Sequence, residues 1–221
     1  MVRVPGKIEW SPGRVVTTAV AGGSDGPAVV VLAHGAGAGR THPFMAALSG
    51  RLAAGGLQVV TFDYPYMAEG RRAPDRLETL VAAHRAVIAA VPHSGRGLVL
   101  AGKSMGGRVA SHLTDVPCDG LVFFGYPLVA VGKTAPRDTS HLGGRSVPML
   151  FIQGERDRLA PLEVLRPVVG RLPHADLVVI SDADHSFRVP KRSGRTDADV
   201  IDQLATAVLA WGPAGGRASP G

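Results

Sequence analysis

The hexapeptide GKSMGG at residues 102–107 decides the fold of this chain more than any other stretch. It follows the apolar run 98–101 (LVLA) and precedes a helix-compatible run at 108–113 (RVASHL). A serine between two glycines at a strand-to-helix junction matches the G-x-S-x-G pattern of a nucleophile elbow. The turn is so sharp that the residues two before and two after the serine must be small, and it lifts the hydroxyl above the sheet edge. Ser104 is therefore the candidate nucleophile, and the rest of the chain must supply a base, an acid and an oxyanion hole.

Length and composition indicate one globular domain. The chain has 221 residues, of which 45% are hydrophobic and 19% are charged, enough to bury a substantial core. No apolar run approaches the roughly 18 residues of a membrane span, and the first residues lack the apolar core of a secretory signal. Cys118 is the only cysteine, which excludes an internal disulfide and favours a reducing compartment. We expect a cytoplasmic protein with one domain over residues 1–211 and a flexible tail over 212–221.

The net charge of +6 does not by itself indicate a macromolecular partner. Arginine far outnumbers lysine, and the basic residues are spread along the chain, a pattern that coding bias can produce. No recognised nucleic-acid-binding module is present, so we expect neither a nucleic-acid nor a membrane partner. Several basic residues fall on loops at the expected active-site end, where they either remain solvated or attract an anionic substrate. They are Arg40, Arg71, Arg72, Lys103, Arg188, Lys191, Arg192 and Arg195.

Apolar runs alternate with helix-compatible segments along the chain. We expect strands at residues 14–20, 28–33, 57–62, 98–101, 120–124, 147–152 and 177–180. The spacing of apolar residues predicts helices at 43–54, 74–91, 108–113, 162–172 and 199–211. This alternation is typical of a three-layer α/β fold with a mostly parallel central sheet, here of about seven strands. The connection at residues 128–146 is the longest loop, and it is too short for a separate lid domain.

Polar residues suited to acyl transfer follow the predicted strands. Ligands of open α/β sheets gather at the carboxyl ends of the strands, and Ser104, Asp157 and His185 each follow one. Imidazole titrates near neutral pH, so His185 can take the proton of the Ser104 hydroxyl during attack. Asp157 would accept the other imidazole N–H and stabilise the imidazolium. The order nucleophile, acid, base along the chain is the one that triads on such sheets follow.

Oxyanion donors and substrate contacts are expected from loops beside this triad. The candidate donors are the backbone N–H groups of Met105, at a helix N-terminus, and of Ala36, in the glycine-rich loop 34–39. The candidate substrate contacts are His34, Gly35, Tyr64, Lys103 and Tyr126. Core packing is an equal alternative for the tyrosines, and His34 is expected to orient its loop rather than to act as the base. No ligand spacing indicates a metal, and the chemistry requires no cofactor.

Five motifs together resemble those of α/β-hydrolases over nearly the whole chain. They are residues 34–37 (HGAG), 102–108 (GKSMGGR), 125–128 (GYPL), 154–157 (GERD) and 184–187 (DHSF). The chain is most similar to the small, lidless group related to dienelactone hydrolases, and within it to the subfamily with testis-expressed and histone-acetyltransferase-complex-associated members. The resemblance implies serine-hydrolase machinery. It does not extend to a lactone substrate, because dienelactone hydrolases use a cysteine where this chain has Ser104.

Simpler interpretations exist for several of these residues. Serine is a favoured helix N-cap, which is the structural alternative for Ser104. Residues 97–104 (GLVLAGKS) also satisfy the P-loop pattern G-x-x-x-x-G-K-[ST], but the four intervening residues are themselves the predicted strand. Asp157 has a competitor in Glu155 within the same turn. Asp184 is a further competitor, although it would have to fold back to reach the ring of its neighbour His185.

The sequence therefore predicts a serine hydrolase that cleaves carboxylic esters of modest size through an acyl-enzyme. Amide or thioester cleavage is the nearest alternative, because the same machinery serves all acyl transfers. A non-catalytic interaction module with the same fold is a second alternative, and a nucleotide-binding protein is the least favoured. The motifs leave open the acyl group, the alcohol and the oligomeric state.

Overall fold

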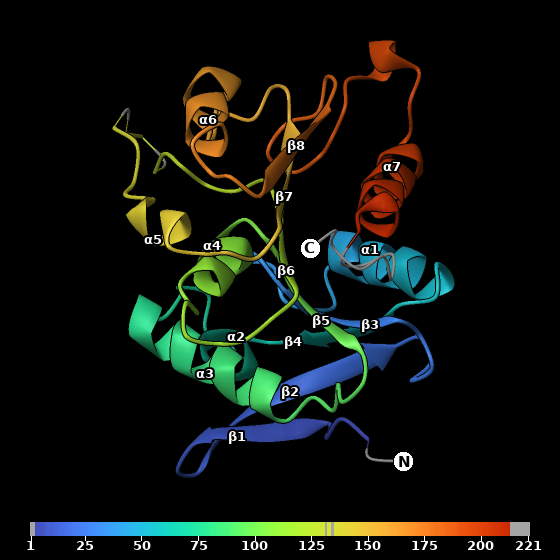
Figure 1. Cartoon of the computed structure of the whole chain (residues 1–221), viewed down its shortest axis with the longest axis vertical. Helices are drawn as coiled ribbons and strands as arrows, with labels where there is room; N and C mark the ends of the chain where they lie inside the picture. The colour runs from blue at the N-terminus through green and yellow to red at the C-terminus, as the bar shows by residue number, and fades with distance from the viewer. Residues whose placement is uncertain (1–2, 131, 134, 213–221) are drawn as a thin grey trace.

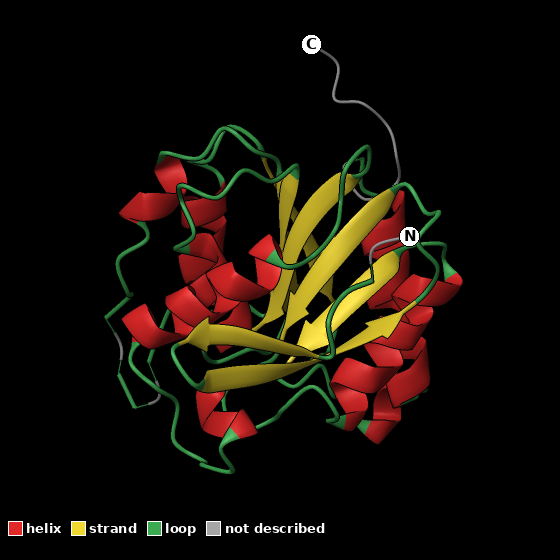
Figure 2. Cartoon of the chain, turned by 90° about the horizontal axis from the view of Figure 1, so that it is seen from below, coloured by secondary structure: helices red, strands yellow, loops and turns green. Residues whose placement is uncertain are grey.

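An eight-stranded sheet forms the centre of the molecule, with helices on both of its faces (Figure 1, Figure 2). The computed structural model describes residues 3–130, 132–133 and 135–212, so the predicted tail lies outside the described residues except for Gly212. The strands are β1 (Lys7–Ser11), β2 (Arg14–Ala21), β3 (Ala28–Ala33), β4 (Gln58–Phe62), β5 (Gly97–Lys103), β6 (Gly120–Phe124), β7 (Met149–Gly154) and β8 (Ala175–Ile180). The helices are α1 (Pro43–Ala54), α2 (Pro65–Ala68), α3 (Leu77–Ala89), α4 (Met105–Ser111), α5 (Ser140–Gly143), α6 (Leu162–Val169) and α7 (Asp197–Ala210), with a 3₁₀ turn η1 (Lys191–Ser193).

The strand order across the sheet is β1-β2-β4-β3-β5-β6-β7-β8. β3 to β8 run parallel, whereas β1 and β2 are antiparallel to their neighbours. The predicted three-layer α/β fold with a mostly parallel sheet is confirmed. The expected count of about seven strands missed β1, because its sequence KIEWS is short and polar and it pairs only with β2 at the sheet edge.

Helix α1 has the predicted bounds, and the other long helices differ at their ends. α3 begins at Leu77 rather than at residue 74, because the Asp75 side chain accepts the Tyr66 N–H at 2.9 Å and stays in the preceding loop. α7 begins at Asp197, two residues earlier than predicted, since Thr196 caps it with a capping box. α5 is a short helix inside the connection expected to be a loop, and α2 is a short helix that the sequence analysis does not predict.

The two faces of the sheet are covered by different helices. Val29 and Val31 of β3 belong to the buried cluster that includes side chains of α3, α4 and α6, while Val30 and Leu32 belong to the one that includes side chains of α1 and α7. Successive side chains of a strand point to opposite faces, so β3 must be apolar at every position. This explains the unbroken apolar run at residues 28–33 and places the polar residues of the chain at the strand ends.

The backbone conformation of residues 97–103 is incompatible with a P-loop. Residues 97–103 form β5, which pairs in parallel with β3 and β6 in the middle of the sheet. These residues cannot wrap a phosphate, so the P-loop interpretation is wrong. In its described part, the connection at 128–146 contains only α5 and an isolated bridge between Val129 and Pro136. Of the helices in the described part of the chain, none has the length and apolar composition that a membrane span needs.

The turn between β5 and α4 is so tight that it excludes side chains at two glycines. A Cβ on Gly102 would lie 2.2 Å from the backbone nitrogen of Gly107. A Cβ on Gly106 would lie 2.5 Å from the carbonyl oxygen of Ala33 and 2.6 Å from that of His34. These atoms belong to backbone that the sheet holds in place, so they cannot move away cheaply. Glycine is therefore required at both positions by close packing of backbone against backbone.

We predict that Gly106→Ala destabilises the protein by about 3 kcal/mol, the upper part of the range for overpacked sites. The matched control is Gly50→Ala on α1, where an added Cβ meets nothing within 4 Å. The control should stabilise the protein by up to about 1 kcal/mol, because alanine has the higher helix propensity. Urea unfolding measures both changes, and equal midpoints for the two variants would contradict the assigned contact.

Candidate active site

Ser104, His185 and Asp157 form one hydrogen-bonded chain at the carboxyl end of the sheet. Ser104 follows β5, Asp157 follows β7, and His185 lies in the loop after β8. The Ser104 Oγ lies 2.8 Å from Nε2 of His185. Nδ1 of the same ring lies 2.7 Å from Oδ2 of Asp157. The fold thus brings together the three side chains that the motifs singled out, at the distances that proton transfer requires.

The backbone of Ser104 adopts a conformation that residues with side chains rarely occupy. Its φ is 49° and its ψ is −115°. Its N–H donates to the Phe124 carbonyl at 2.9 Å, and its own carbonyl accepts the Arg108 N–H at 3.1 Å. Ser104 occupies the N-cap position of α4, but its side chain makes no capping hydrogen bond there. The capping alternative therefore does not account for its hydroxyl, which points to His185 instead.

Asp157 is a buried carboxylate with a full set of partners. Its side chain is almost entirely inaccessible, with 2% of the residue exposed. Oδ2 accepts from His185 and from Nε2 of Gln153 at 2.5 Å, and Oδ1 accepts the Leu159 N–H at 2.7 Å. Burial by itself raises the pKa of Asp157, but the hydrogen bond and charge of His185, the Leu159 amide and the charge of Lys103 outweigh it and leave the pKa below its usual value. The carboxyl is thus ionised at neutral pH.

The two competing acids have other partners. Oε2 of Glu155 accepts the Asp182 N–H at 2.8 Å, which ties the turn after β7 to the turn after β8. Oδ1 of Asp184 accepts the N–H groups of Ser186 at 2.8 Å and Arg188 at 3.0 Å, and so shapes the loop that carries His185. Neither contacts the imidazole. Both carboxylates therefore have structural roles next to the triad.

Lys103 is hydrogen-bonded to the backbone of His185 and also lines a cavity beside Ser104. Its Nζ donates to the His185 carbonyl at 2.7 Å and lies 5.4 Å from the centre of the Phe187 ring. Burial lowers the pKa of Lys103 to about 8 against the opposing effect of nearby carboxylates. A Cβ on Gly125, whose φ is +67°, would lie 3.3–3.4 Å from Lys103 Nζ, Asp157 Oδ2 and His185 Nδ1. Glycine at position 125 thus leaves room for the three polar side chains to meet. The sequence analysis does not predict this cluster.

His34 orients the glycine-rich loop. The ring is fully buried, and its Nε2 accepts the Tyr64 N–H at 3.0 Å. Nδ1 must then carry the proton, and it donates to the Gly35 carbonyl at 2.8 Å. Burial lowers the pKa of His34 and keeps the ring neutral. Gly35 packs beside the nucleophile, since a Cβ on it would lie 3.5 Å from Cβ of Ser104.

The two tyrosines expected as substrate contacts lie in the core instead. Tyr64 is fully buried, and its hydroxyl is 3.2 Å from Nδ1 of His84, a ring whose pKa burial lowers to about 3. Tyr126 is 1% exposed and packs edge-on against Phe123. Position at a strand end suggested a pocket wall for both. Both rings pack among core side chains instead, Tyr64 edge-on against Phe62 and His34.

Ser104 lies between two cavities. One, of about 290 Å³, also contains His185, Lys103 and Phe44 in its wall. The other, of about 500 Å³, contains Met105 and extends along α3 and α4. Ala36, Ser104 and Leu159 line both. The two predicted amide donors, Ala36 and Met105, thus belong to the segments that border the nucleophile.

A second serine–histidine pair, not anticipated from the sequence, joins Ser111 of α4 to His141 of α5. Ser111 Oγ is 2.9 Å from Nε2 of His141 and 3.1 Å from the Tyr126 hydroxyl. Ser111 is fully buried, and it also donates to the Arg108 carbonyl at 2.7 Å. The ring of His141 stacks on that of His112 with centres 3.8 Å apart. Because Ser111 is not accessible to a substrate, its hydrogen bond with His141 has a structural role and connects α4 to α5.

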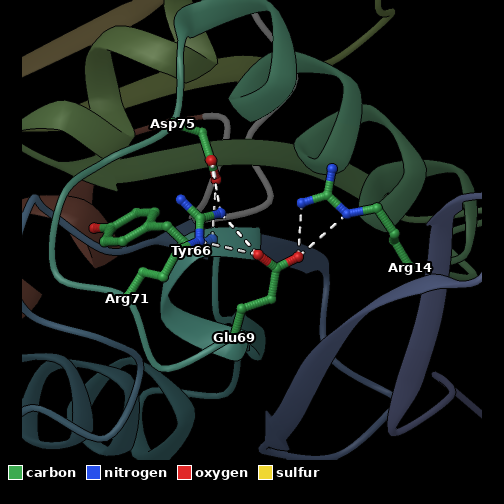
Figure 3. Close-up of polar contacts among 5 residues, drawn as sticks. All are labelled: Arg14, Tyr66, Glu69, Arg71 and Asp75. Carbon is green, nitrogen blue, oxygen red and sulfur yellow. Dashed lines mark hydrogen bonds and ion pairs between the residues drawn. The ribbon is translucent and has the colours of Figure 1, made fainter.

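Some of the basic loop residues have local carboxylate partners. Arg71 pairs with Glu69 at 2.8 Å and Asp75 at 2.7 Å, and Glu69 also accepts from Arg14 (Figure 3). Arg40 pairs with Asp63 at 3.0 Å. The charges of Arg40 and Arg71 are thus compensated by neighbouring carboxylates. Within the described residues, no group of three or more His, Cys, Asp and Glu side chains is placed to hold a metal ion.

Solved structures share this architecture along most of the chain. A serine hydrolase homologue from Coxiella burnetii superposes with a TM-score of 0.74 at 21% identity, covering 94% of this chain and 99% of that one. A serine hydrolase without a lid from Xanthomonas campestris gives 0.68 at 20% identity, covering 93% of each chain. A dienelactone hydrolase from Anabaena variabilis gives 0.70 at 18%, covering 92% and 94%. At these identities the likeness establishes the fold.

Sequence comparison gives the family. A search of curated proteins found no significant match. Residues 26–212, which include every residue of the hydrogen-bonded chain at Ser104, match the family model described as "Alpha/beta hydrolase domain". The chain therefore belongs to the α/β-hydrolase family.

Proposed function

We propose that this protein is a serine hydrolase that cleaves carboxylic esters through an acyl-enzyme. The observation that carries the proposal is the hydrogen-bonded chain from Ser104 through His185 to the buried Asp157, with Ser104 facing two cavities. A serine hydroxyl is a weak nucleophile until a base accepts its proton, and this arrangement supplies both the base and the group that orients it.

In the first half of the proposed reaction, Ser104 Oγ attacks the ester carbonyl while Nε2 of His185 takes its proton. Asp157, ionised and hydrogen-bonded to Nδ1, stabilises the imidazolium. The carbonyl oxygen gains negative charge, and the amides of Ala36 and Met105 are the proposed donors to it. Met105 is the first residue of α4, where N–H groups have no acceptor inside the helix.

In the second half, the tetrahedral intermediate collapses and His185 returns its proton to the leaving alkoxide. The alcohol departs, and the acyl group remains bonded to Ser104. A water molecule then gives a proton to His185 and attacks the acyl carbonyl, which releases the acid and restores the serine. Each proton that leaves one oxygen is returned to another, so the cycle needs no cofactor.

We further propose that the chain is closest to the lidless, dienelactone-hydrolase-related group and its testis-expressed subfamily, on the motifs around Ser104, Asp157 and His185. A cytoplasmic location is the matching proposal, supported by the single, half-buried Cys118. Thioester or amide cleavage would use the same residues. Activity on a panel of matched esters, thioesters and amides separates these possibilities from a module without activity.

We predict that Ser104→Ala abolishes labelling by a fluorophosphonate probe and lowers esterase activity by at least about 10³-fold, as expected when a triad nucleophile is removed. The control is Ser111→Ala, which removes the other histidine-bonded serine hydroxyl. This variant should still be labelled, although it loses about 1–3 kcal/mol of stability because Tyr126 and His141 lose a partner. Labelling that persists in Ser104→Ala would refute the proposed nucleophile.

Replacing the acid tests its assignment separately. We predict that Asp157→Asn lowers kcat by about 10³- to 10⁴-fold, because the neutral amide cannot stabilise the imidazolium or hold the required tautomer. Asp184→Asn and Glu155→Gln are the controls, since both carboxylates bind backbone N–H groups away from the ring. Steady-state kinetics at saturating ester compares the three variants. A larger loss in either control than in Asp157→Asn would assign the acid elsewhere.

A further inference from the structure

The two cavities beside Ser104 take different parts of an ester if the proposed function holds. The leaving oxygen must receive its proton from Nε2 of His185. The alcohol therefore lies in the smaller cavity, whose wall contains His185. His185 does not line the larger cavity, which holds Met105 and extends along α4. The acyl group accordingly lies in the larger cavity.

Two arginines without a carboxylate partner line this acyl cavity. Arg108 is half-buried and lies one turn after Ser104 on α4. Its guanidinium donates to the Asp138 carbonyl oxygen at 3.4 Å and to the Tyr126 hydroxyl. Arg137 is exposed, in the connection after β6. Among the described residues, neither guanidinium has an aspartate or glutamate within ion-pair distance, whereas Arg14, Arg51, Arg71 and Arg85 each do.

The acidic groups nearby do not neutralise these arginines. Asp75 is the one carboxylate in the described wall of the acyl cavity. One of its oxygens accepts from Arg71 at 2.7 Å and the other accepts the Tyr66 N–H at 2.9 Å (Figure 3). The Asp138 carboxylate is bound to the amide and hydroxyl of Ser140 at 2.9 and 2.8 Å. Arg108 and Arg137 thus give this cavity an uncompensated positive charge.

The remaining wall of the cavity is mostly apolar. It is formed by side chains of α3 and α4 and of the loops that follow β6 and β7. They are Leu77, Leu80, Val109, Pro127, Val129 and Leu159. A volume of about 500 Å³ is in the range of sites that hold small organic ligands. Its chemistry suits a short hydrocarbon chain with an anion at its far end.

We propose that the larger cavity is an acyl site for esters of dicarboxylic acids, in which Arg108 and Arg137 bind the free carboxylate while Ser104 attacks the esterified one. The inference rests on the proposed hydrolase function and names its substrate class. A guanidinium binds a carboxylate through paired, charge-assisted hydrogen bonds. Arg108 lies one helical turn, about 6 Å along the helix axis, from Ser104. Because both residues line the same cavity, a short dicarboxylic acid monoester can contact both.

The first test compares two isosteric substrates. Monoethyl adipate carries the free carboxylate, and the ethyl ester of adipic acid monoamide replaces it by a neutral amide. We expect kcat/KM to be at least about 10-fold higher for the charged ester, as charge-assisted hydrogen bonds allow. In Arg108→Gln and in Arg137→Gln, the ratio of kcat/KM for the charged ester to kcat/KM for the neutral ester should fall toward one. Arg137 is exposed, so its variant folds even if Arg108→Gln does not.

The control for position is Arg188→Gln. Arg188 lines a different cavity, beyond Phe44 and Phe187 on the side of α1 and α7. This variant should keep the preference for the charged ester. The inference is overturned if the unmodified protein has about the same kcat/KM for the charged and the neutral ester. It is also overturned if Arg188→Gln loses the preference and the Arg108 and Arg137 variants keep it. Either result leaves the hydrolase function intact.

A second test needs no turnover. Monoethyl adipate should raise the melting temperature of Ser104→Ala more than the ethyl ester of adipic acid monoamide does, since a ligand that binds the folded state stabilises it. Adding Arg137→Gln to Ser104→Ala should remove that difference. If no ester is cleaved and Ser104 is not labelled, the proposed function fails, and this test then decides only whether Arg108 and Arg137 bind a free carboxylate in this cavity. Equal shifts with the two esters overturn the inference.

Discussion

One backbone contact sets the geometry of the site: the first turn of α4 presses against the carbonyl oxygens at the end of β3. No side chain fits at Gly106, whose Cβ would come within 2.5 Å of the Ala33 oxygen, or at Gly102 on the other side of the turn. The chain therefore reverses within a few residues and holds Ser104 at a φ of 49°, a strain that functional sites commonly store. The same turn starts the helix that carries Met105 and Arg108, so the nucleophile, a proposed amide donor and a proposed carboxylate ligand are positioned together.

Behind the nucleophile, the protein buries charge and compensates it. Burial opposes ionisation of both Asp157 and Lys103. Taken by itself, burial raises the pKa of the Asp157 carboxyl and lowers the pKa of the Lys103 ammonium group. Their mutual attraction and their hydrogen bonds to His185 offset this cost, and Gly125 leaves the space in which the three groups meet. Hydrogen bonds in such low-dielectric surroundings are strong and leave little freedom of orientation. His185 is thereby held in place through both its imidazole ring and its backbone carbonyl.

Hydrogen-bond distance alone does not distinguish the proposed nucleophile from the other serine in this molecule. Ser104 and Ser111 lie 2.8 and 2.9 Å from a histidine Nε2. They differ in access, because Ser104 borders two cavities while Ser111 is fully buried under α5. Arginines differ in the same manner: Arg71 is neutralised by its neighbours, and Arg108 is left without a carboxylate at a cavity wall. Whether a serine or an arginine is available to a ligand therefore depends on its burial and on the ion pairs and hydrogen bonds that it already makes within the protein.

The sequence by itself determined nearly all of the fold and the candidate nucleophile and base, because those features follow from local constraints. Unbroken apolar runs mark strands covered on both faces, and glycines on either side of Ser104 mark a turn that admits no side chains. Only the tertiary structure decided that Asp157 rather than Glu155 meets His185, that Tyr64 turns into the core, and that Lys103 turns toward the His185 carbonyl. Neighbouring positions on one loop carry equivalent local signals. The direction of each side chain is set by contacts with residues far away in the sequence, which no local pattern encodes.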